Sequence, residues 1–85
     1  MPYIQPTSRP RFDHGIEELA ANINTPGELN YVISRLLVKL YDEHTSYDMI
    51  NTLIGVLECA KLEFYRRVAA QYEQAKMLAN GDVYF

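Results

Sequence analysis

The stretch "GVLECAKLEFYRR", Gly55 to Arg67, reads as part of a helix with two apolar sides. One side belongs to a long stripe with the three- and four-residue spacing of a helix face. We call it the core stripe: Ile50, Leu53, Ile54, Leu57, Ala60, Phe64, Val68, Tyr72 and Ala75. The other side carries mostly small or apolar residues in steps of four, three, four and three, like the seam of a coiled coil. We call it the association face: Gly55, Cys59, Leu62, Arg66 and Ala69. Because the core of the chain covers one side of a helix, the second side predicts contact with another protein surface.

A simpler interpretation of the association face is an ordinary exposed surface, since folded proteins expose many apolar atoms. Two further features favour self-association. The helix that contains this face is predicted over residues 46–79 and is about 50 Å long at the standard rise, whereas a compact chain of this size is about 30 Å across. The mostly polar side of the preceding helix also carries two apolar residues, Tyr31 and Val38, which we predict to belong to the self-association face as well.

Two shorter helices are predicted before the long one. Residues 13–24 begin with Asp13 as N-cap, and an apolar stripe follows at helical spacing: Ile16, Leu19, Ala20 and Ile23. Residues 26–43 follow the clearest start signal in the chain, "TPGE", in which Thr25 is the N-cap and Glu28 completes a capping box. Each of these helices has one apolar face to bury against the others.

The ends of the long helix carry signals of their own. Its start is predicted at Thr45 or Ser46, and Thr45 with Asp48 would form a second capping box. Gly81 marks its stop. The tail over residues 80–85, "NGDVYF", ends in three apolar residues, so we expect it to fold back on the helices or onto a partner chain.

Proline dominates the segment before the first helix, with Pro2, Pro6 and Pro10 inside residues 1–12. Proline fixes φ and favours an extended residue before it, so this segment is predicted to be an extended arm that docks on its own chain or on a neighbour. The expected fold is therefore a single all-α domain over residues 1–85. It is a small three-helix bundle, with a short, a medium and a long helix and an extended, Pro-rich N-terminal arm.

Composition and charge narrow the possible functions. The 85 residues carry a formal net charge of −3, which argues against nucleic-acid binding, because that requires a basic field to displace counterions. No apolar run approaches the roughly 20 residues that span a bilayer, and the N-terminal sequence does not resemble a signal peptide. With a single cysteine the chain has no internal disulfide. We expect a cytoplasmic protein that does not bind membranes.

Candidate catalytic and metal-binding residues are sparse. His14, His44 and Cys59 fall on separate predicted elements and lack the spacing of metal ligands. All-α nucleotide pyrophosphohydrolases hold Mg²⁺ with carboxylates on paired helices, since this cation prefers oxygen ligands. The helical acids of this chain do not form that quartet: Glu17, Glu18, Glu58 and Glu63. We therefore expect no metal, no cofactor and no catalytic residues, and the sequence favours a non-enzymatic role.

Several phrases are distributed along the chain: "NYVISRLL", "GVLECAKLEFYRR", "NGDVY" and the opening "MPYI" with "RPRFD". Together they resemble a family of uncharacterised proteins associated with bacterial and phage genomes, and the resemblance covers nearly the whole chain. It implies kinship but carries no activity with it. In the family pattern a proline often precedes the tyrosine that corresponds to Tyr72, whereas this chain has Gln71. The continuity of the long helix near Gln71 is therefore left open.

Together these features predict a self-associating helical protein with a structural or adaptor role. A homodimer is the favoured assembly, because two-fold dimers are the commonest closed oligomers, and an unidentified protein partner is the other possibility. The alternative function is a small helical enzyme or ligand-binding protein, similar to a nucleotide pyrophosphohydrolase, whose site forms across a dimer.

Overall fold

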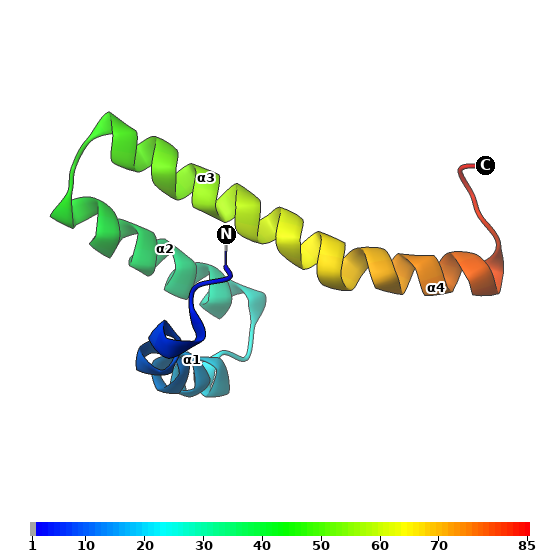
Figure 1. Ribbon diagram of the computed structural model, residues 1–85, viewed down its shortest axis with the longest axis horizontal. Helices are drawn as coiled ribbons and strands as arrows, with labels where there is room; N and C mark the ends of the chain where they lie inside the picture. The colour runs from blue at the N-terminus through cyan, green and yellow to red at the C-terminus, as the bar shows by residue number, and fades with distance from the viewer. Residues whose placement is uncertain (1) are drawn as a thin grey trace. The chain divides into compact units, whose positions relative to one another are not determined.

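The computed structural model describes residues 2–85, and within these residues the protein is all-α with no strand. A short 3₁₀ helix precedes three helical stretches, the last of which contains a π-helical turn (Figure 1). The elements are η1 (Pro6–Ser8), α1 (Pro10–Asn22), α2 (Pro26–Glu43), α3 (Tyr47–Phe64), the π-helical turn η2 (Tyr65–Ala69) and α4 (Ala70–Asn80). The chain divides into two compact units, one ending at Leu53 and the other comprising Ile54–Phe85.

Helix α1 begins earlier than the predicted residue 13. Pro10 stands in the first turn, where its fixed φ suits a helix and its missing N–H removes no hydrogen bond. Asp13 therefore lies inside the first turn and is not the N-cap. The predicted extended arm over residues 1–12 is wrong beyond Gln5, because residues 6–8 form η1 and residues 10–12 belong to α1. The Arg9 side chain also ties this segment to its own chain, since its Nε donates a hydrogen bond of 3.0 Å to the Ile4 carbonyl.

Helix α2 occupies residues 26–43, as the sequence predicts, and its capping box is present. The Thr25 hydroxyl accepts a hydrogen bond from the Glu28 N–H at 3.1 Å. In return, the Glu28 carboxylate accepts the N–H groups of Thr25 and Asn24 at 3.1 and 2.7 Å. This reciprocal arrangement satisfies amides that the first turn leaves without helical partners.

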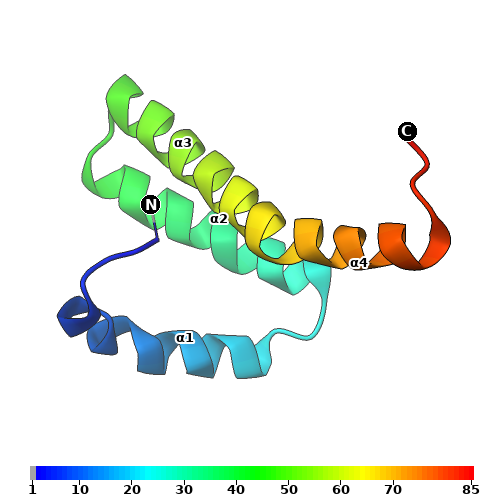
Figure 2. The same cartoon turned by 45° about the vertical axis from the view of Figure 1, so that its right-hand side comes forward.

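The connection to α3 is short and fixes the start of that helix. Ser46 is the N-cap, because its hydroxyl accepts the Met49 N–H at 3.0 Å. The other predicted cap, Thr45, instead donates its hydroxyl to the Tyr41 carbonyl at the end of α2. Within the first unit, α2 and the opening turns of α3 lie side by side (Figures 1 and 2). The half-buried apolar residues of these two segments are Val32, Leu37, Tyr41, Met49 and Leu53.

In the second unit, one helical run continues from residue 54 to Asn80. The ribbon passes from α3 into α4 without a loop (Figure 2), and there is no break at Gln71. The run is not uniformly α-helical, because the Ala70 N–H donates to the Tyr65 carbonyl, five residues back, in the manner of a π-helix. It ends at Gly81, whose φ of 90° favours glycine and whose N–H donates to the Met77 carbonyl at 2.8 Å.

None of residues 2–85 is fully buried. The core stripe, expected to be sheltered by the rest of the chain, is exposed along the second unit: Phe64 is 67% exposed and Tyr72 is 64% exposed. In the first unit, Ile16 on the stripe of α1 is exposed as well, and no Cα atom of α1 comes within 8 Å of one in α2. The prediction of a covered core stripe is therefore wrong for this chain alone. A single helix shields little of its own apolar surface, so cover must come from another segment or another molecule.

Candidate functional site

The first half of the association face is an exposed strip on α3. Leu62 is 57% exposed and the Cys59 thiol is free and exposed. A Cβ built on Gly55 would meet no atom within 4 Å, so this glycine borders open space. Small residues at both Gly55 and Cys59 leave room for the backbone of a second helix to come close. The three residues share one side of α3, as their spacing predicts.

Arg66 and Ala69, the second half of the predicted face, belong to the π-helical turn. Arg66 Nη2 donates to Glu63 Oε1 at 2.7 Å, which holds the guanidinium beside its own helix. Ala69 is half-buried within the turn. A π-helical hydrogen bond encloses one residue more than an α-helical one, so every position after the turn is set back by about 100° around the helix axis.

This rotation changes the composition of the association face beyond Arg66. In an uninterrupted α-helix, the face would pass through Ala69 and reach the Glu73 carboxylate. With one residue inserted, the same side of the helix carries three neutral residues of α4: Ala70, Gln74 and Leu78. Sequence reasoning missed these residues because it assumed one helical period throughout. The segment "YRRVA" contains no proline or glycine that would signal the irregularity.

Tyr31 and Val38, the other two predicted face residues, lie in the first unit. Both are exposed, at 66% and 43% of their surface. They are seven residues apart on α2, which places them on the same side of that helix two turns apart. They form a separate apolar strip on α2.

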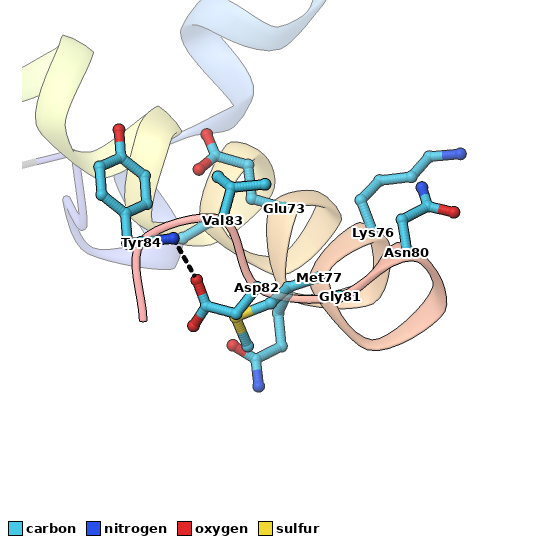
Figure 3. A pocket seen from close by; sticks show the side chains of 10 residues that line it. Glu73, Lys76, Met77, Asn80, Gly81, Asp82, Val83 and Tyr84 are labelled. Atoms are coloured by element: carbon cyan, nitrogen blue, oxygen red, sulfur yellow. Dashed lines mark hydrogen bonds between the residues drawn. The ribbon is translucent and has the colours of Figure 1, made fainter.

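A groove with a volume of about 460 Å³ lies between α4 and the tail (Figure 3). The tail folds back over α4. The Asp82 carboxylate stabilises this turn of the tail, because it accepts hydrogen bonds from the N–H groups of Tyr84 at 2.8 Å and Phe85 at 3.4 Å. The Val83 and Tyr84 side chains remain almost wholly exposed. Residues of α4 that follow the π turn form the floor of this groove, among them Ala70, Gln74 and Met77. Two of the residues that continue the association face, Ala70 and Gln74, therefore line this groove, whereas Leu78 is not part of its lining and is exposed.

A hydrogen bond spans the π turn beside this groove. Tyr65 Oη donates to Glu73 Oε1 at 2.7 Å. The bond to the Glu73 carboxylate, and the negative charge of that carboxylate, raise the pKa of Tyr65 above its ordinary value of 10.0. Partial desolvation and the nearby Tyr84 raise it further. The tyrosine is thus kept as a neutral donor, and its hydroxyl is not activated as a nucleophile or a base.

Two further ion pairs lie on the surface of the helices. His14 lies 3.2 Å from Glu18, and Lys61 lies 3.1 Å from Glu58, each pair within one helix. Exposed pairs of this kind add little stability. Among residues 2–85, no three His, Cys, Asp or Glu side chains come together in a way that would hold a metal ion. No helix in the same range is long and apolar enough to cross a membrane.

Comparison with known proteins identifies one family. The family model described as "Domain of unknown function (DUF6899)" matches residues 1–83. No curated protein and no solved structure matches the chain significantly. The geometry of the exposed helices is therefore the main guide to function.

Proposed function

This chain belongs to the DUF6899 family, a domain of unknown function, and from that premise we propose that it is a self-associating helical protein with a structural or adaptor role. We also propose a cytoplasmic location and a phage or bacterial origin, and the resemblance of its sequence phrases to proteins of those genomes supports the origin. The observation that carries the proposal is the helical run of the second unit, which has apolar residues exposed on two sides.

Exposure on this scale has a large energetic consequence. Burying a large aliphatic or aromatic side chain completely is worth about 1.5–3 kcal/mol. Leu62 on the association face, and Phe64 and Tyr72 on the core stripe, each leave more than half of their surface in water. Within residues 2–85 the single chain has no buried core to stabilise it. Burial of several such side chains against a second molecule supplies stabilising free energy instead.

The association face is well suited to a second copy of itself. In an antiparallel two-fold pair centred on Leu62, each Leu62 meets its symmetry mate. Gly55 of one copy then lies at the height of Ala69 and Ala70 of the other, so small residues oppose small residues and the two helices approach closely. Glu58 and Arg66 are equally far from Leu62 and opposite in charge, so each carboxylate lies at the height of the second copy's guanidinium. This self-complementarity supports a homodimer.

The core stripe supports the adaptor part of the proposal. It lies on the opposite side of the run from the association face, and its residues Leu57, Phe64 and Tyr72 are exposed. A dimer formed through the association face leaves this stripe available to another protein. Apolar stripes on helices are a common recognition surface, in which residues at helical spacing enter a groove.

Sedimentation velocity over a range of protein concentrations tests self-association. We expect a species of twice the 9.8 kDa chain mass that dissociates on dilution. A particle that stays at 9.8 kDa at every concentration would refute the proposal. Cysteine crosslinking adds the orientation: in an antiparallel pair centred on Leu62, a cysteine introduced at residue 62 crosslinks to its own symmetry mate.

A further inference from the structure

The hydrogen bond between Tyr65 and Glu73 joins residues on opposite sides of the π turn. Tyr65 is the first residue of the turn, and Glu73 lies in the first turn of α4. The 2.7 Å distance between Tyr65 Oη and Glu73 Oε1 requires both side chains to point along the same side of the helical run. The turn itself is marked by the hydrogen bond from the Ala70 N–H to the Tyr65 carbonyl.

This alignment depends on the π turn. Two residues that are eight apart in a regular α-helix are separated by about 80° around the axis, because each residue adds about 100°. One inserted residue removes about 100° from that sum, which leaves the two positions about 20° apart. The insertion therefore brings Tyr65 and Glu73 into line, and the hydrogen bond in turn favours the inserted register.

We infer that the hydrogen bond between Tyr65 and Glu73 is a register lock, which holds residues 65–69 in the π-helical turn and so sets the rotation of α4 relative to residues 54–64. Without the bond, the segment relaxes to an α-helix, since π turns are the rarer and less favourable form. All of α4 then rotates by about 100° around the axis, as a single unit.

The rotation acts on the association face, and this consequence depends on the self-association proposed above. In the locked register that face continues through Ala70, Gln74 and Leu78, all of which are neutral. In the relaxed register Glu73 takes the place of Gln74 in the middle of the face. Two symmetry-related carboxylates then lie on the surface that a second copy must cover, where an unpaired charge is costly. The lock thus keeps a charge off the interaction surface.

The register can be measured directly by NMR, through scalar couplings across backbone hydrogen bonds. In the unaltered protein we expect the Ala70 nitrogen to couple to the carbonyl carbon of Tyr65. In Tyr65→Phe, which keeps the ring and removes only the hydroxyl, we expect this coupling to disappear and the Ala70 nitrogen to couple to the carbonyl carbon of Arg66. Retention of the coupling to residue 65 in this variant would overturn the inference.

Three matched variants separate the lock from a general effect on the helix. Tyr72→Phe removes a hydroxyl from the same helical run, but leaves the Tyr65–Glu73 bond in place, so it should keep the π register. Glu73→Gln retains an acceptor oxygen and should also keep it, whereas Glu73→Ala should shift the register as Tyr65→Phe does. A shift in Tyr72→Phe, or no shift in Glu73→Ala, would contradict the lock.

The same variants distinguish the failure of the lock from the failure of self-association. The couplings report the register whether or not the chain forms a dimer. Sedimentation reports the assembly whatever the register is. If the protein forms the dimer and the hydrogen bond sets the register, Tyr65→Phe weakens dimerisation at least about tenfold, which corresponds to a change of about 1.4 kcal/mol. A shifted register with unchanged dimerisation would refute only the proposed effect on the association face.

Discussion

Replacement of Leu62 by arginine gives the most direct test of the association face. Leu62 keeps 57% of its surface exposed in the single chain. Complete burial of leucine is worth about 1.5–3 kcal/mol, so covering the exposed part contributes about 0.9–1.7 kcal/mol in each copy. A two-fold dimer buries the residue twice, which gives a total of about 1.7–3.4 kcal/mol. At about 1.4 kcal/mol for each factor of ten, Leu62→Arg should weaken dimerisation at least about 15-fold.

The second element of this test is a control with equal exposure. Val56 is 56% exposed on the same helix but lies about 120° around the axis from Leu62. Val56→Arg should therefore change the dimer dissociation constant less than about threefold. Sedimentation equilibrium measures both constants, and far-ultraviolet circular dichroism shows whether each variant stays helical. Equal weakening by the two substitutions, or a dimer that Leu62→Arg leaves intact, would show that this side of α3 is not the contact.

Three further predictions concern local structure. Thr25→Ala removes the cap acceptor of α2 and should lower the free energy of unfolding by about 1 kcal/mol in urea denaturation, whereas Ser34→Ala, a matched loss of a hydroxyl inside the helix, should change it less. Gly81→Ala places a side chain where φ is 90°, a local strain of about 1–3 kcal/mol. It should speed hydrogen exchange of the tail amides about fivefold or more without lowering the midpoint of global unfolding. The pKa of Tyr65 is raised in the folded chain, so the stability that its protonated hydroxyl contributes is fully present below pH 10.0 and is lost as the pH rises through the folded-state pKa. Glu73→Gln should lower that pKa, which an ultraviolet titration of tyrosine measures.

The sequence predicted those features that depend on short-range chemistry. The start of α2 follows from "TPGE", in which every residue has one structural role, and the structure has the same capping box and the same bounds. The all-α class follows from apolar spacing over three separate stretches. The stop at Gly81 was equally local, because a positive φ strongly favours glycine there.

The errors in prediction arose where two local signals competed or where none existed. At the first helix, Asp13 and Pro10 are both good start residues, and the structure uses the proline, which makes the helix three residues longer at its N-terminal end. At the π turn, the residues of "YRRVA" all suit an ordinary α-helix. Its stabilising contact joins Tyr65 to a residue eight positions away, a spacing that no α-helical rule examines.

The core stripe shows a different kind of limit, because the sequence indicates an apolar side of the helix but not the surface that covers it. A periodic stripe shows that one side of a helix must be covered, and it contains no information about what covers it. Isolated helices are marginally stable in water, and most of their stability in proteins comes from packing of the apolar side.

That dependence on packing has a consequence for the folding of the second unit. Its helical run exposes apolar side chains on both the core stripe and the association face, so its free energy of folding depends on whatever molecule covers them. If the cover is a second copy, stability rises with protein concentration, because association removes the folded chain from the folding equilibrium. Helicity of residues 54–80 and dimerisation should then fall together on dilution. If residues 54–80 keep their full helicity as the dimer dissociates, the helix folds before association and does not depend on the second copy.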